Sequence, residues 1–122
     1  MSATPWVVGL VVLAAMLLVN RLGQASPAVV RDLARRGARI IDVRTRAEFS
    51  SGHLPTAVNR PLGELAGGIG AIAPDKDQPV LLHCASGARS ESAKRILRGM
   101  GYRHVVNVGS NARARRLLAP EG

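Results

Sequence analysis

The chain has 122 residues, which is room for one domain and little else. Its 17 Lys and Arg outnumber its 8 Asp and Glu, giving a formal net charge of +9. The single cysteine excludes an intramolecular disulfide and a CxxC pair, and the 3 histidines are scattered, so no metal site or cofactor is expected. The basic surplus is suited to small anions or lipid head groups. Phe49 and Tyr102 are too few aromatics for base stacking, so no nucleic-acid partner is expected.

The N-terminal segment is uncharged in its side chains, and Trp6 to Val19 is a near-continuous apolar run. A membrane-spanning helix needs about 20 mainly apolar residues. Residues 1–20 are therefore predicted to be a transmembrane anchor, with residues 4–20 in contact with the membrane. Arginines follow the run and none precedes it, which places the domain in the cytoplasm as a single-pass membrane protein. The alternative is a cleaved secretory signal, since Gly23 to Ala25 has a small-x-small pattern that would release a secreted or periplasmic domain.

After a linker at residues 21–26, residues 27–122 are predicted to form one domain in which short apolar strands alternate with amphipathic helices. Helices are expected at 27–37, 62–72, 90–100 and 111–118, a short helix capped by Thr45 with Glu48, and strands at 39–43, 57–59, 79–83 and 104–108. Such alternation is typical of a parallel α/β layer fold. The weakest of these elements is the helix at 62–72, which contains Gly67, Gly68 and Gly70.

Cys84 lies within Val80 to Ser90 (VLLHCASGARS), where a buried strand ends and a glycine-containing loop leads into a helix. Ligands bind at the carboxyl ends of parallel strands, and successive amides of such a loop can form an anion-binding nest. Gly87 permits a positive φ, the helix N-terminus adds positive potential, and Arg89 adds a full charge at the rim. Each favours the thiolate, so the pKa of Cys84 should fall. The alternative is a buried cysteine acting as a small hydrophobe.

The sequence resembles the rhodanese family in three places. Ile40 to Asn59 (IIDVRTRAEFSSGHLPTAVN) is similar to the family's DVR strand end, acidic-aromatic pair and GHIPGA-type turn. Cys84 to Ser90 (CASGARS) resembles its CxxGxRS active-site loop, and Gly101 to Ser110 resembles its last strand. The resemblance covers roughly residues 27–111. It implies a rhodanese-like three-layer α/β fold, with a central parallel sheet flanked by helices, and a cysteine that carries a persulfide.

This resemblance implies a sulfurtransferase in which the Cys84 thiolate takes the outer sulfur of a small anion such as thiosulfate. A thiol, of a small molecule or a protein, or cyanide then removes that sulfur. Cys84 and Arg89 are the predicted catalytic residues, and the predicted substrate-binding residues are Ala85, Ser86, Gly87, Ala88 and Ser90. One alternative is a persulfide relay or redox-sensing module at the membrane. Another is a phosphatase or arsenate reductase. The related enzymes of these two classes resemble a Cys-x5-Arg pattern, whose loop is longer than the six residues from Cys84 to Arg89.

Other polar residues have structural interpretations beside functional ones. Asp42 and Arg44 resemble the family's DVR pair and form a second tier of site candidates, although a structural ion pair is the favoured interpretation. His53 is expected to fix its own turn. His83 is expected to face the core, because adjacent side chains on a strand point to opposite faces.

The sequence departs from the family pattern at both ends of the domain. The family's first strand is hard to find before Pro27. The last helix has no aromatic residue, although that end normally helps to wall the pocket. Its arginines, which are candidates for contact with anionic lipid, are Arg113, Arg115 and Arg116.

Overall fold

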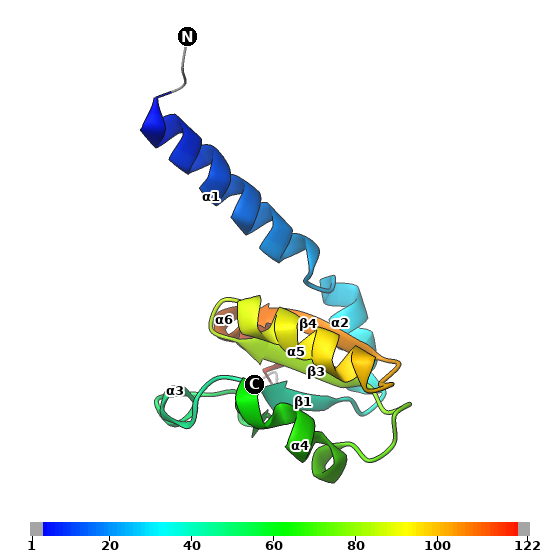
Figure 1. Cartoon of the computed structure of the whole chain (residues 1–122). Helices are drawn as coiled ribbons and strands as arrows, with labels where there is room; N and C mark the ends of the chain where they lie inside the picture. Colours follow the sequence, from blue (N-terminus) through cyan, green and yellow to red (C-terminus); the bar gives the residue numbers. More distant parts are fainter. Residues whose placement is uncertain (1–3, 120–122) are drawn as a thin grey trace.

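The computed structural model describes residues 4–119. Its elements in chain order are α1 (Pro5–Leu22), α2 (Pro27–Arg35), β1 (Arg39–Asp42), α3 (Arg46–Ser50), β2 (Val58–Asn59), α4 (Leu62–Ile72), β3 (Val80–Cys84), α5 (Ala88–Gly99), β4 (Val105–Ser110) and α6 (Asn111–Leu118). The strands form one sheet in the order β2-β1-β3-β4, and every adjacent pair is parallel. The predicted parallel α/β fold is confirmed (Figure 1).

Helices cover both faces of the sheet and enclose two separate hydrophobic clusters. Between the sheet and α4 and α5 lies the larger cluster, which includes Ile41, Leu82 and Leu97. Between the sheet and α2 and α6 lies the smaller one, built on Val30 and Leu81. Strand β3 is buried along its whole length because both faces are covered. The sheet is therefore the middle layer of three, as predicted.

Most element boundaries follow the local chemistry of the caps. Ser26 caps α2 by accepting a hydrogen bond from the Val29 amide, and Pro27 occupies the first turn. Thr45 and Glu48 form the predicted capping box of α3. Helix α5 starts at Ala88 rather than at the predicted Ser90, because Gly87 adopts a left-handed conformation with φ of 99° and ends the loop there.

The linker contributes one contact to the edge of the sheet. Gln24 forms a parallel bridge with Asn107 of β4, and the Ala25 amide donates to the Asn107 carbonyl at 2.8 Å. This single bridge lies in the segment before Pro27, where the sequence showed no first strand. It ties the chain that follows α1 to the outer edge of β4.

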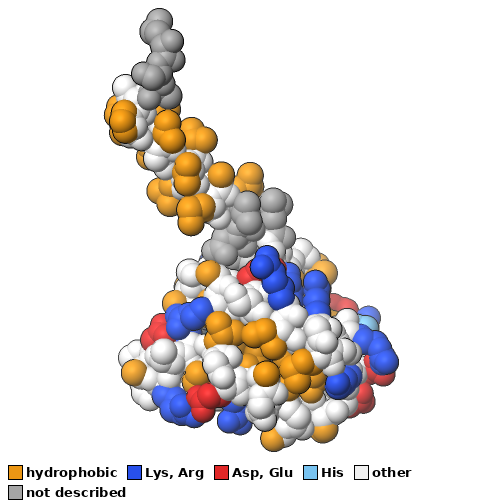
Figure 2. Space-filling view, in the orientation of Figure 1, with side chains coloured by type: hydrophobic (Ala, Val, Ile, Leu, Met, Phe, Trp, Pro, Cys, Tyr) orange, Lys and Arg blue, Asp and Glu red, His pale blue; other side chains and the backbone are white. Residues whose placement is uncertain are grey.

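Helix α1 extends away from the domain (Figure 1), and much of its visible surface is apolar (Figure 2). Trp6, Leu10 and Met16 are each more than half exposed. Within residues 4–119, however, no helix is long and apolar enough to cross a membrane. The anchor was predicted at residues 1–20, of which residues 1–3 lie outside the described residues, and the helix spans Pro5–Leu22. Its assignment as a transmembrane span is not supported. The cytoplasmic orientation inferred from that span stays a prediction.

His83 faces the core, as expected, and it is fully buried. Neither ring nitrogen has a hydrogen-bond partner among the described residues. Burial lowers the pKa of His83 from 6.5 to about 4; the charge of Asp42 opposes this, and the charges of Arg44 and Arg115 add to it. The ring is therefore neutral in the folded protein at neutral pH, because desolvation penalises the imidazolium.

We expect this buried histidine to make the protein less stable in mild acid. As the pH falls below 6.5, the unfolded chain takes up a proton at His83 that the folded protein resists until about pH 4. The free energy of unfolding should thus fall by about 2 kcal/mol from His83 between about pH 7 and about pH 5. Denaturant titrations at both pH values measure it, and a His83→Gln variant should lack this component. An equal fall in the free energy of unfolding of the His83→Gln variant would show that His83 is not its cause.

Candidate active site

Cys84 is the last residue of β3, and its side chain belongs to the larger hydrophobic cluster with no exposed surface. The loop that follows turns its amides back toward the sulfur. The Gly87 amide donates to Sγ at 3.0 Å and the Ser90 amide at 3.4 Å, and the Ser90 hydroxyl lies 3.4 Å from Sγ. A buried cysteine that served only as a hydrophobe would not need these donors. The sulfur therefore occupies an anion-binding nest.

The electrostatics of this nest favour the thiolate. Burial alone raises the pKa of the Cys84 thiol, since it penalises the charged form. Hydrogen bonds from the Ser90 hydroxyl and from the amides of Ser90, Gly87 and Ser86 outweigh that penalty, and the net pKa is lowered. A thiolate is the nucleophilic form of cysteine, and the lowered pKa raises the fraction of Cys84 that is in this form at neutral pH.

Gly87 is required at the turn of this loop for two reasons. Its φ of 99° is a conformation that other residues resist. A Cβ at this position would also lie 2.8 Å from Nε2 of Gln24 and 3.3 Å from Cα of Gly109. The linker and β4 therefore pack directly against the loop that carries the sulfur donors.

Asn107 of β4 holds this loop from the side. It is fully buried, and its Oδ1 accepts from the Gly109 amide at 2.9 Å. The same Oδ1 lies 2.7 Å from the Ser90 hydroxyl, so it and Sγ are alternative acceptors for the single proton of that hydroxyl. Its Nδ2 donates to the Gly87 carbonyl and to Glu91 Oε2, each at 3.0 Å. Every hydrogen-bonding position of the side-chain amide is thus used, and it fixes both loop residues that donate to Sγ.

The sequence suggested that Arg89 adds a full, unpaired charge at the rim of the loop, but in the structure its charge is paired. It forms a bidentate ion pair with Glu48 of α3, with nitrogen–oxygen distances of 2.6 and 2.8 Å. The hydrogen bonds to Glu48 raise the pKa of Arg89, and the nearby charge of Cys84 raises it further. Arg89 thus adjoins both the sulfur and a carboxylate that offsets its charge.

The other predicted residues divide into two groups. Ser86 contributes an amide toward the sulfur, whereas the Ala88 amide lies 3.5 Å from the Ser86 hydroxyl. Ala85, Ser86 and Ala88 are exposed. Asp42 and Arg44 form the expected buried ion pair at 2.8 Å, and Arg44 also donates to the Gly52 carbonyl. This pair braces the β1 end and the following turn.

A protein-family comparison matches this geometry to a known domain. The family described as "Rhodanese-like domain" matches residues 26–110, which include the whole sheet and the Cys84 loop. The chain belongs to the rhodanese-like domain family. The resemblance seen in the sequence is therefore confirmed.

Individual relatives agree with this assignment. The thiosulfate sulfurtransferase PspE of Escherichia coli K12 is 42% identical over 69 residues, which are 57% of this chain and 66% of PspE, just under two thirds. The thiosulfate sulfurtransferase GlpE of Pseudomonas savastanoi is 30% identical over 95 residues, covering 78% of this chain and 88% of that protein.

Solved rhodaneses have the same fold. A structure described as rhodanese with anions from E. coli has a TM-score of 0.63 and 36% identity, and covers 68% of this chain and 94% of that one. The human single-domain sulfurtransferase TSTD1 has a TM-score of 0.62 and 27% identity, and covers 82% of this chain and 98% of that one. Together these relatives support a rhodanese-like sulfurtransferase.

Sequence reasoning missed two residues of this rhodanese site. Glu48 was recognised as a capping residue and as part of the acidic-aromatic pair, but its position 41 residues before Arg89 gave no sign of their pairing. Asn107 was passed over although it interrupts an otherwise apolar strand, HVVNV. A polar residue in a buried strand needs hydrogen-bond partners, so that interruption was the available signal.

We expect a Glu48→Gln variant to lower the pKa of the Cys84 thiol. Arg89 holds the pKa of Glu48 at about 2, so the carboxylate is charged whenever the thiol titrates and offsets the Arg89 charge beside the sulfur. Glutamine removes that charge yet can still complete the capping box. The pH dependence of Cys84 alkylation measures the change. Glu64→Gln, which breaks the Arg46 ion pair, is the matched control, and an equal shift there would contradict this account.

Proposed function

We propose that this protein is a thiosulfate sulfurtransferase that carries sulfane sulfur as a persulfide on Cys84. The observation that supports this most strongly is the set of hydrogen-bond donors from Gly87 and Ser90 that converge on Sγ. Such donors stabilise a sulfur anion, and we expect them to stabilise the negative charge of a Cys84 persulfide as well. The relatives named as thiosulfate sulfurtransferases support the choice of donor.

The proposed reaction is a double displacement that needs no general acid or base. The Cys84 thiolate attacks the outer sulfur of thiosulfate, the sulfur–sulfur bond of thiosulfate breaks, and sulfite leaves with the bonding electrons. Cys84 then bears a persulfide anion. In the second step a thiolate or cyanide attacks the outer sulfur, and the Cys84 thiolate leaves. Charge is carried throughout by sulfur or sulfite, so the lowered pKa of Cys84 supplies the required nucleophile.

Access to the sulfur is the main demand that the structure places on this reaction. Sγ has no exposed surface, whereas the loop residues Ala85, Ser86 and Ala88 are exposed. The loop therefore has to shift outward to admit a donor and to make room for a second sulfur atom. Such a requirement also favours a second candidate function, a relay that accepts sulfur from one protein and passes it to another without rapid turnover.

One experiment tests the proposal and separates the two functions. The full chain is incubated with thiosulfate, and mass spectrometry should find the mass of one added sulfur atom on Cys84. Rapid cyanide-dependent turnover would then support the enzyme, and loading without turnover would support the relay. Failure of thiosulfate and of a persulfide donor to load Cys84 would overturn both.

A further inference from the structure

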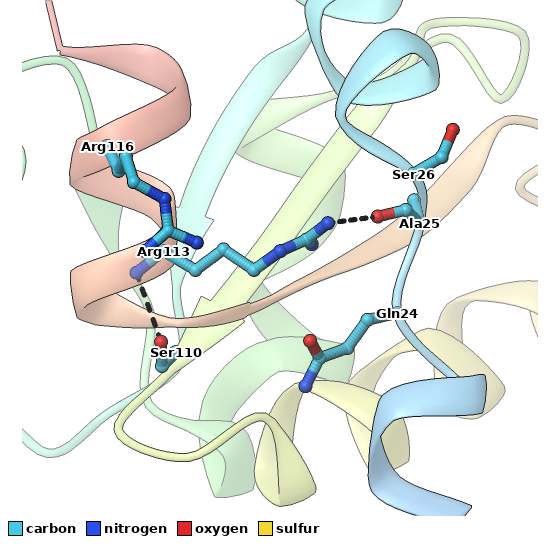
Figure 3. Close-up of a pocket in the computed structure, with 6 residues that line it drawn as sticks. All are labelled: Gln24, Ala25, Ser26, Ser110, Arg113 and Arg116. Carbon is cyan, nitrogen blue, oxygen red and sulfur yellow. Dashed lines mark hydrogen bonds between the residues drawn. The ribbon is translucent and has the colours of Figure 1, made fainter. Parts of the chain in front are cut away.

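A cavity of about 480 Å³ lies at the junction of the linker, α2 and α6 (Figure 3). It is lined by Gln24, Ala25, Ser26, Ser110, Arg113 and Arg116. Arg113 and Arg116 both arise from α6, and the Arg113 side chain reaches across to the linker (Figure 3). No lining residue is acidic, so the cavity is polar and positively charged.

Arg113 is held in place by backbone carbonyls rather than by a carboxylate. Its guanidinium donates to the Val108 carbonyl at 2.6 Å and to the Ala25 carbonyl at 2.7 Å. Burial lowers the pKa of Arg113, and the positive charge of Arg116 lowers it further. Within residues 4–119 neither arginine forms an ion pair. Among the described residues, Arg113 is thus held in place and Arg116 lies near it, and no carboxylate pairs with either of them.

The backbone adds to the positive potential of the same cavity. Ser26 and Ser110 are the N-caps of α2 and α6, and each hydroxyl oxygen accepts a hydrogen bond from its helix. Both hydroxyls still carry a proton that they can donate to a ligand. The positive ends of two helices thus meet beside the arginines, and such ends attract anions.

The cavity is separate from the nest around Cys84. Cys84 packs in the cluster beneath α4 and α5, whereas the cavity lies by α2 and α6 on the other face of the sheet. The two are close in the fold, since Ser110 is the strand partner of Cys84 and Gln24 contacts Gly87. A ligand in the cavity would therefore lie beside the loop but would not occupy the sulfur site.

We propose that this cavity binds a tetrahedral oxoanion of the phosphate or sulfate class, either free or as the terminal group of a phosphomonoester. The two guanidinium groups supply charge, and the Ser110 hydroxyl, on the same side as the arginines, can supply a hydrogen bond (Figure 3). The volume leaves space beyond a single tetrahedral group, which a phosphomonoester would use. For Arg113 this assignment replaces the predicted contact with lipid, because its side chain is turned inward to the linker. The lipid contact predicted for Arg115 and Arg116 stays a prediction.

Isothermal titration calorimetry on the full chain tests the proposal with inorganic phosphate, sulfate and glycerol phosphate, each at constant ionic strength. Binding should survive alkylation of Cys84, which blocks the nest around the sulfur. Arg116→Gln should weaken binding about tenfold, as expected for the loss of one charge-assisted contact. Tighter binding of glycerol phosphate than of phosphate would identify the phosphomonoester as the occupant, and the reverse would identify the free anion.

Two controls make the outcome decisive. Arg31→Gln removes an exposed arginine of α2 that does not line the cavity, and it should leave affinity unchanged. Arg113→Gln should also weaken binding, but that side chain also anchors the linker, so the exposed Arg116 provides the primary test. No binding by any of the three anions, loss of binding on alkylation, or equal affinity in Arg116→Gln and the unmodified chain would each overturn the proposal.

Discussion

Replacing Cys84 by serine is expected to abolish sulfur transfer, with a loss of at least roughly a thousandfold. A serine hydroxyl stays protonated at neutral pH and cannot hold a sulfane sulfur as a persulfide. The nest itself should remain, because the Gly87 and Ser90 amides can donate to the serine oxygen in place of Sγ. The variant should therefore fold with nearly unchanged stability, and the loss will report chemistry. Cyanide-dependent release of thiocyanate from thiosulfate measures it.

Ser90→Ala is the graded comparison for that experiment. It removes the hydroxyl that lies 3.4 Å from Sγ but keeps the Ser90 and Gly87 amides, so the thiol pKa should rise and transfer should slow without ceasing. Because Cys84 is the only cysteine, no second thiol can substitute for it. Sulfur transfer at the normal rate by Cys84→Ser would refute the persulfide mechanism.

Much of the fold could be predicted because its signals are local. The capping box at Thr45 and Glu48, the apolar run of β3 and the helix at Leu62–Ile72 each depend on residues within a few positions of one another. The helix at Leu62–Ile72 forms although glycines have a low helix propensity. The burial of Leu65 and Ile69 against the rest of the core outweighs that cost. Local pattern was thus enough to place the elements in order.

The site could be predicted only where it, too, is local. The donors around Cys84 come from Ser86, Gly87 and Ser90, which lie in one short loop. Glu48 and Asn107 enter the site through tertiary packing, and no spacing rule links either to the loop. The sequence therefore showed no sign that Glu48 offsets the charge of Arg89. A charged residue can be found from sequence, but its counter-charge depends on the fold.

Asn107→Asp is expected to raise the pKa of the Cys84 thiol and to slow its reactions at neutral pH about tenfold. The new carboxylate keeps acceptors for the Ser90 hydroxyl and the Gly109 amide. It loses the donors to the Gly87 carbonyl and Glu91, and it brings a negative charge next to the hydroxyl that serves the sulfur. Both changes disfavour the thiolate. Alkylation rates across a pH series measure the shift.

The pH profile distinguishes positioning from a general structural role. If Asn107 acts through the thiolate, raising the pH should restore the rate of Asn107→Asp, since the thiol then ionises despite the added charge. Asn59→Asp is the matched control, because the Asn59 Nδ2 also donates two hydrogen bonds, to the carbonyls of Asp42 and Arg44, but at the other edge of the sheet. It should cost stability without moving the thiol pKa. A pKa that is unchanged in Asn107→Asp, or equally shifted in both variants, would show that Asn107 supports only the fold.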